Sequence, residues 1–282
     1  PEYCERMKAI ALIERWRELS PSDWSQSEYG WILPNGKPIV LADWQRAVLD
    51  TWYANSNVST LAISAPKKCG KTLLNAVLLC WRWLCLEGEH FAVGNDLDQS
   101  QARQFSEISD MVRRHPFLRS KVKSDKKRLE FKPTYSTITA LPVDAAGNAG
   151  SNHLTCSHTE AWGIINEGAV RGFEELTPPP FRHHGYPSLR IVDSYAGFDG
   201  DSALWHGIVD RGLAGELISD HYPIYRNNRT LLFHIEGEEG QERCFRGDAE
   251  ERIEYLTDQR EQLRPAAYQR LHANKRSTGS ES

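Results

Sequence analysis

The chain lacks several features that would place it in a specialised class of protein. No apolar run in its 282 residues is long enough to cross a membrane, and the polar, charged start from Pro1 to Lys8 does not resemble a secretion signal. No Cys-x-x-Cys pair is present either, so neither a zinc ribbon nor a disulfide framework is expected. The six scattered cysteines are Cys4, Cys69, Cys80, Cys85, Cys156 and Cys244. These absences favour a soluble cytoplasmic enzyme with reduced thiols.

Length and hydrophobic pattern predict a large α/β domain followed by a smaller one. A chain of this size can bury a full core, and short strands alternate with helical patterns along most of it, which predicts a mostly parallel sheet flanked by helices. The pattern weakens after Gly215, so we expect a core over residues 1–212 and a linker subdomain over 213–282. The expected helices are 5–19, 41–52, 73–84, 98–114 and 249–264, and the expected strands are 59–64, 91–95, 128–131, 137–141, 153–157 and 189–194.

Residues 65–72, Ala-Pro-Lys-Lys-Cys-Gly-Lys-Thr, match the phosphate-binding P-loop except at the first glycine, where Ala65 stands. In such a loop, backbone N–H groups surround the β-phosphate, a lysine reaches the β- and γ-phosphates, and a hydroxyl binds Mg²⁺. Those roles fall to Gly70, Lys71 and Thr72. A β-favouring run precedes the loop and an apolar helical pattern follows it, as the motif requires. Because Ala65 replaces the first glycine, the alternative is that Gly-Lys-Thr occurs here by chance in a surface loop.

Further positions are candidates for ATP chemistry. Gln45 offers an amide donor and acceptor to adenine, and the ring of Trp44 can stack on the base, although a tryptophan is more often part of the core. Glu160 is expected at the end of the strand beside the P-loop strand, where it can orient and deprotonate the attacking water. Ser194 ends another expected strand and can sense the γ-phosphate. Asp193, which precedes Ser194, is the second candidate for the carboxylate that holds Mg²⁺, after the segment around Glu160.

Charge is distributed unevenly, although the net charge is only −4. Residues 113–128 contain eight Lys or Arg against Asp125, a local net charge of +7. Such a run can follow a phosphate backbone, supply an arginine to a neighbouring subunit's ATP, or form a solvated surface. Residues 236–261 contain ten Asp or Glu and four Arg, and we expect them to form the exposed surface of an accessory region.

Taken in order, these motifs resemble the ATPase half of the large terminase subunit of tailed bacteriophages. The resemblance is carried by Trp44-Gln45, residues 65–72, Asp98-Gln-Ser-Gln-Ala-Arg103, Thr159-Glu-Ala-Trp162 and Ser194-Tyr-Ala-Gly197. It extends into residues 201–206 and 264–274, so it covers nearly the whole chain. Each motif is loose, and the ordered set is more specific than any one of them.

The resemblance implies an ATP-driven motor that docks on the portal protein of a procapsid and pumps double-stranded DNA in the cytoplasm of the host cell. It also implies a small terminase subunit as a partner, self-association into a ring, and ATP and Mg²⁺ as cofactors. The implied ATP-binding residues are Trp44, Gln45, Lys67, Lys68, Cys69, Gly70, Lys71 and Thr72. The implied catalytic residues are Glu160, Lys71 and Ser194, and Ser194 to Gly197 would couple hydrolysis to movement.

Three departures from the family pattern affect these expectations. Lys67 stands where the family often has an arginine, which keeps the charge and loses the bidentate fork. Thr159 stands where an aspartate is usual, so we expect Mg²⁺ to be held through water and more weakly. Ala149, in the glycine-rich loop 147–151, stands where relatives frequently carry an arginine that acts in trans. The obvious substitutes are Arg113, Arg114, Arg119 and Arg128.

Other expectations concern what the chain does not do. It stops at Ser282, where the nuclease domain of the family should begin, so no DNA cleavage is expected. A DEAD-like helicase fragment is an alternative, but a second RecA-like domain has no room after Gly215. A non-catalytic or weakly active nucleotide-binding scaffold is the other alternative, and ATP turnover distinguishes it. Cys69, close to a helix N-terminus, is expected to have a lowered pKa and to react with alkylating agents.

Overall fold

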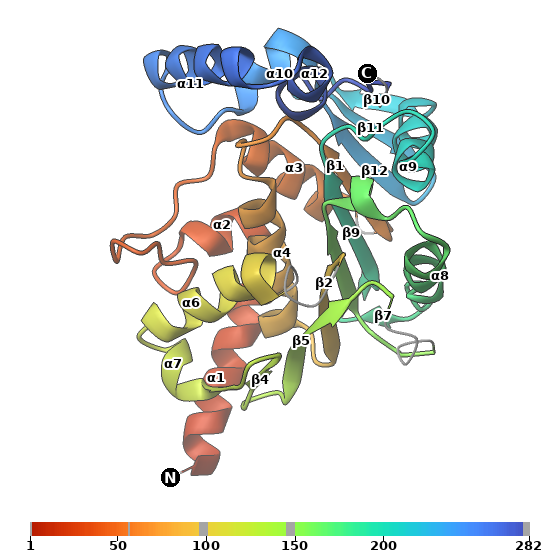
Figure 1. Cartoon of the computed structure of the whole chain (residues 1–282). Helices are drawn as coiled ribbons and strands as arrows, with labels where there is room; N and C mark the ends of the chain where they lie inside the picture. Colours follow the sequence, from red (N-terminus) through yellow and green to blue (C-terminus); the bar gives the residue numbers. More distant parts are fainter. Residues whose placement is uncertain (1, 56, 96–100, 145–149, 279–282) are drawn as a thin grey trace.

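The computed structural model describes residues 2–55, 57–95, 101–144 and 150–278. A ten-stranded sheet runs through the chain, with helices on both of its faces (Figure 1). This confirms the predicted fold class, an α/β P-loop fold with a mostly parallel sheet. Within the described residues, no helix has the length and apolar character needed to cross a bilayer.

Six parallel strands form the middle of the sheet. Their order is β12 (Thr230–His234), β1 (Thr60–Ser64), β9 (Leu189–Ser194), β6 (Thr155–Thr159), β2 (Glu89–Gly94) and β5 (Ser136–Pro142). Antiparallel strands extend both edges: β11 (Ile224–Asn227) and β10 (Glu216–Ser219) follow β12, and β4 (Arg128–Phe131) and β3 (Val122–Ser124) follow β5. A separate hairpin pairs β7 (Arg182–His183) with β8 (Tyr186–Pro187). The central strands are buried on both faces, which explains their nearly continuous apolar sequences.

Two groups of helices cover the sheet (Figure 1). One face carries α1 (Glu2–Arg17), α2 (Pro21–Gln26), α3 (Asp43–Ala54), α4 (Lys71–Cys85), α6 (Ser106–Arg114) and the short α7 (Leu118–Lys121). The other face carries α8 (Glu167–Glu175) and α9 (Ala203–Leu213). Every residue of α4 except Thr72 is buried, because this helix lies between the sheet and the outer helices. The helix that begins at the P-loop is therefore held on all sides.

The last three helices lie outside the sheet, beside the end where the P-loop is found (Figure 1). They are α10 (Gly237–Cys244), α11 (Ala249–Gln262) and α12 (Pro265–His272). The Lys67 backbone N–H donates to the Leu271 carbonyl at 2.7 Å, and the Asn274 amide donates to the Ser64 hydroxyl at 3.0 Å. The C-terminal segment is thus bonded directly to the P-loop and to the strand before it.

Several boundaries differ from those expected. Residues 216–234 were placed in a linker subdomain starting at 213, but they form β10 to β12 and continue the sheet next to β1. The segment outside the sheet begins at α10 instead. Part of the helix expected over 98–114 is a π-helix, η1 (Gln101–Phe105), followed by α6, and residues 96–100 lie outside the described part. The pairing of residues 128–131 with 137–141 is confirmed as the antiparallel β4–β5 pair.

Candidate nucleotide-binding site

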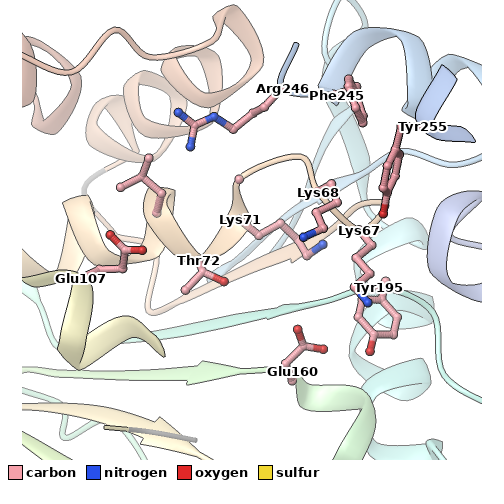
Figure 2. Close-up of a pocket in the computed structure, with 12 residues that line it drawn as sticks. Lys67, Lys68, Lys71, Thr72, Glu107, Glu160, Tyr195, Phe245, Arg246 and Tyr255 are labelled. Atoms are coloured by element: carbon pink, nitrogen blue, oxygen red, sulfur yellow. The ribbon is translucent and has the colours of Figure 1, made fainter. Parts of the chain in front are cut away.

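A cavity of about 680 Å³ lies between the P-loop, the end of β6 and the C-terminal helices (Figure 2). It is lined by Lys67, Lys68, Gly70, Lys71, Thr72, Leu73, Glu107, Glu160, Tyr195, Phe245, Arg246 and Tyr255. The three lysines gather on the P-loop side, and Glu160 faces them from across the cavity. Five predicted P-loop residues therefore line the same cavity as the predicted catalytic carboxylate.

The P-loop has the backbone geometry that its glycine predicts. Gly70 has φ +90°, a left-handed conformation, and α4 begins at the next residue. A side chain at position 70 would also lie 2.9 Å from both the Gln45 amide nitrogen and a methylene of Arg246. Ala65, in contrast, is not among the residues with positive φ, so the loop does not need a glycine there. The unusual first position therefore does not disturb the loop.

Lys71 is buried in the loop, with 6 % of its surface exposed. Its Nζ donates to the carbonyls of Ala65 at 2.8 Å and Pro66 at 2.7 Å, and lies 5.6 Å from the centre of the Tyr195 ring. Thr72, the next residue, lines the cavity. The charge and the hydroxyl expected to meet phosphate and metal are thus adjacent at the N-terminus of a helix, where anions bind favourably.

Glu160 is fixed at several atoms. It has φ +57° and directly follows β6. One carboxylate oxygen pairs with Nη1 of Arg103, from η1, at 2.9 Å, and the other accepts the indole N–H of Trp162 at 2.8 Å. Its backbone carbonyl accepts from the Asn95 amide at 3.3 Å. A strained backbone held by this many partners is typical of functional positions.

We expected Glu160 to follow the strand directly beside the P-loop strand. It follows β6 instead, which is one strand farther away. β9 lies between β1 and β6, with Ser64, Ser194 and Asp193 at the strand ends. Thr159, the proposed magnesium partner, pairs in register with Asp193; it is buried and is not among the residues that line the cavity. Glu160 reaches the cavity because the chain turns there.

Ser194 supports the turn that carries Glu160. It is fully buried, and its hydroxyl accepts the backbone N–H of Trp162 at 3.1 Å. The next residue, Tyr195, lines the cavity instead. Burial raises the pKa of Tyr195 to about 12, with the nearby Glu160 charge adding to the shift and Arg270 opposing it. Ser194 therefore contacts the turn after Glu160 and does not line the cavity, where a γ-phosphate sensor would lie.

Asp193 is not among the residues that line the cavity. Its carboxylate accepts from the Asn75 amide of α4 at 2.7 Å, and the side chain is buried. Burial raises its pKa to about 7, although the neighbouring Lys71 charge opposes the shift. Among the described residues no group of three or more His, Cys, Asp or Glu side chains could hold a metal ion.

Gln45 and Trp44 lie beneath the P-loop. The Gln45 amide accepts from the Ala42 N–H at 3.0 Å and donates to the Gly70 carbonyl at 3.2 Å. Trp44 is fully buried and stacks on Phe233, with ring centroids 5.1 Å apart. Neither is among the cavity-lining residues. In this arrangement Gln45 supports the P-loop, and Trp44 belongs to the core, the second of the two roles that we considered for it.

The expected reactive thiol is contradicted. Cys69 is buried, and its thiol donates to the Pro66 carbonyl at 2.9 Å. Burial raises its pKa, and the positive charge of Lys71 offsets this only in part. The favourable helix N-terminus is outweighed by the loss of water around the sulfur.

The sequence interpretation missed the wall formed by Phe245, Arg246 and Tyr255. The Phe245 and Tyr255 ring centroids are 5.6 Å apart, and the Arg246 side chain passes over Gly70. All three lie in the acidic segment 236–261, which we had expected to be only exposed surface. The aromatic residues and the arginine within that acidic run were the available signal.

The basic residues 113–128 lie toward the other end of the sheet, on α6, α7 and the β3–β4 hairpin (Figure 1). Arg113 pairs with Asp110, and Lys121 pairs with Glu5 at 2.6 Å. Lys123, Lys126, Lys127 and Arg128 are exposed around the hairpin. Ala149 and residues 145–148 lie outside the described residues.

The strand order and the loop between β1 and α4 define a P-loop fold, and solved structures of bacteriophage large terminases are similar to it. The large terminase of bacteriophage HK97 is similar with a TM-score of 0.68 at 18% identity, over 91% of this chain and 55% of that protein. The large terminase ATPase domain of Thermus phage P74-26 gives 0.58 at 14% identity, over 91% and 99%.

A third similar structure is the large terminase of another thermophilic bacteriophage, with a TM-score of 0.57 at 10% identity, over 85% of this chain and 54% of that protein. The chain therefore spans about half the length of the HK97 protein and of this third protein. No protein-family profile and no curated protein sequence matches it. The likeness is one of fold.

Proposed function

We propose that the chain is the ATPase motor part of a viral DNA-packaging terminase and couples ATP hydrolysis to translocation of double-stranded DNA. The observation that carries this proposal is the Glu160 carboxylate facing Lys71 and Thr72 across one cavity. The terminase-type fold supports the same function. A phosphate loop and a candidate general base in one space are what hydrolysis of a nucleoside triphosphate requires.

The residues present suit ATP and Mg²⁺. The cavity volume is within the range of small-molecule sites. Lys71 would exchange its two loop carbonyls for β- and γ-phosphate oxygens, and the Thr72 hydroxyl would hold Mg²⁺. Thr159 would act on the metal only through water, from its buried position. When bound, Mg²⁺ would neutralise charge on the phosphate oxygens.

Glu160 would orient the attacking water and accept its proton. Arg103 and Trp162 each bind one of its carboxylate oxygens, which fixes the direction of the group. A carboxylate oxygen has a second lone pair, so both remain able to accept from water. Arg103 is therefore a positioning residue for the proposed base.

The wall of Phe245, Arg246 and Tyr255 would receive the nucleotide base and ribose. Aromatic faces and a guanidinium both stack on a purine, and Arg246 lies over the loop glycine. Gln45 would act beneath the loop by holding the Gly70 carbonyl. This assignment moves adenine contact from the residues before the P-loop to the C-terminal segment.

The partners follow from the motor function. The exposed cations of the β3–β4 hairpin would bind the phosphate backbone of DNA, with an affinity that falls as salt rises. A portal protein, a small terminase subunit and neighbouring copies in a ring would complete the assembly in the host cytoplasm. An arginine of the 113–128 segment would then reach the ATP of the next subunit.

Two variants test the proposal. Lys71→Ala is expected to abolish ATP turnover by removing phosphate binding, whereas Glu160→Gln is expected to bind ATP normally and lose ~10²–10⁴-fold in rate. Glu175→Gln is the matched control, because Glu175 is exposed on α8 and its ion pair there is with Arg171. Turnover above about a tenth of wild type in Glu160→Gln would exclude it as the base. Failure of the unmodified protein to bind any nucleotide would overturn the proposed function.

A further inference from the structure

Arg270, on α12, is a buried cation without an acidic partner in the described structure. Only 8 % of its surface is exposed, and no Asp or Glu oxygen of the described residues lies within ion-pair distance. Its Nε and Nη1 atoms are buried and have no hydrogen-bond partner among those residues. Burying an unpaired charge is costly, because the water that solvated it is lost. Arg270 therefore lowers the stability of the folded protein in the absence of a partner.

Three aromatic rings surround the Arg270 guanidinium. Its Cζ lies 4.6 Å from the ring centre of Trp162, 5.2 Å from that of Tyr195 and 4.2 Å from that of Phe198. Ring faces attract a cation, and this attraction offsets part of the burial cost. The Tyr195 hydroxyl also interacts with the guanidinium, but the Nε and Nη1 donors have no partner among the described residues and remain available to an anion.

One side chain separates Arg270 from the cavity. The Tyr195 ring lines the cavity and lies near Lys71 Nζ on one side and Arg270 on another. Trp162, which also covers Arg270, donates its indole N–H to the Glu160 carboxylate. The guanidinium therefore lies directly behind the residues that face the proposed γ-phosphate position.

We propose that Arg270 is a phosphate-sensing residue: it binds the terminal phosphoryl group of a nucleoside triphosphate when the Tyr195 ring moves aside. This inference rests on the proposed function of the same cavity. A guanidinium suits this ligand because its planar donors match two phosphate oxygens at once. The arginine comes from the same chain, so this contact does not depend on a neighbouring subunit.

Binding of Arg270 to the nucleotide would also couple the presence of a γ-phosphate to the position of the C-terminal helices. The backbone of α12 contacts the P-loop through the Lys67–Leu271 hydrogen bond, and Asn274 bonds to both Ser64 and Ala196. A shift of Arg270 toward the cavity would therefore pull on α12, which is bonded to the P-loop. ADP lacks the terminal phosphoryl group and would leave Arg270 in its aromatic surroundings.

The decisive variant is Arg270→Met, which keeps an apolar side chain of similar length among the three rings. Thermal unfolding is measured without nucleotide, with Mg–ADP and with a non-hydrolysable Mg–ATP analogue. If Arg270 awaits an anion, the nucleotide-free variant melts about 2–4 °C higher than wild type, because an unpaired buried charge is gone. The extra rise in Tm that the ATP analogue gives over ADP is lost, and the Kd for the analogue increases at least ~10-fold while that for ADP is unchanged.

Arg260→Met is the matched control, since Arg260 also lies over an aromatic ring, 5.1 Å from the centre of Tyr268, but is exposed. It is expected to respond to both nucleotides like wild type. A lower nucleotide-free Tm in Arg270→Met, or an unchanged preference for the analogue over ADP, would show that Arg270 only packs the core. Arg270→Lys, which keeps the charge, is expected to recover part of that preference. If wild type responds to no nucleotide, the proposed function fails before this inference is reached.

Discussion

Replacing Asp193 by asparagine should make the protein more stable, and more so at high pH. The carboxyl is buried against α4, where its one described hydrogen bond comes from the Asn75 amide. The Asn75 carbonyl oxygen is buried and has no partner among the described residues. An asparagine at position 193 keeps the acceptor, adds a donor beside that oxygen, and removes the charge that burial disfavours.

The magnitude follows from the pKa of Asp193. Burial raises this pKa from 3.8 to about 7. The folded protein therefore keeps the proton up to about pH 7, whereas the unfolded chain releases it near its ordinary value, so the free energy of unfolding falls as pH rises between the two. Linkage gives a cost of about 2 kcal/mol near pH 5 and about 4 kcal/mol near pH 8, a difference of about 2–3 kcal/mol.

The assay is urea denaturation of wild type and Asp193→Asn at both pH values. Other groups titrate in the same range, including buried histidines such as His153, whose pKa burial lowers to about 4. Their contributions cancel when the two proteins are compared at each pH. The gain from the substitution should be larger near pH 8 by about 2–3 kcal/mol. An equal gain at both pH values, or destabilisation near pH 8, would refute the argument that this carboxyl is destabilised by burial.

Three further outcomes are expected. Gly70→Ala should cost about 1–2 kcal/mol of stability, because position 70 is left-handed, and should weaken ATP binding; a variant with wild-type urea midpoint and KM would contradict this. Cys69 should react with iodoacetamide far more slowly than the exposed Cys4, as mass spectrometry of the labelled peptides can check, and equal rates would contradict its burial. Arg103→Ala should lower kcat at least ~10-fold with little change in KM, and added guanidinium should restore part of the rate; an unchanged kcat would remove its positioning role.

The P-loop unit and much of the sheet could be predicted because the signals are local. The strand before the loop, Gly70 and the helix beginning at Lys71 are contiguous, and each position has its own conformational reason. The strand ending at Ser194 was also predicted within its bounds. Glu160 was predicted as a catalytic carboxylate from its place after a strand, and it does line the cavity, although the order of the strands was not apparent from the chain.

The rest depends on contacts between distant segments. β10 to β12 are short and have polar ends, so they do not stand out, and their place in the sheet comes from pairing with β1 far earlier in the chain. Arg246 meets Gly70 only because the last helices fold back over the P-loop. Arg270 becomes unusual only when its burial is known. Hydrophobic periodicity predicts local helices and strands but not which distant segments come into contact.

The Asn274 side chain ties the C-terminal end of the chain to the sheet. Its amide joins three strand ends, through Ser64 at the end of β1, Ile235 after β12 and Ala196 after β9. A pull on the chain beyond this residue would therefore act first on the ends of β1, β9 and β12. Asn274 therefore couples the C-terminal end of the chain to three strands of the sheet at once.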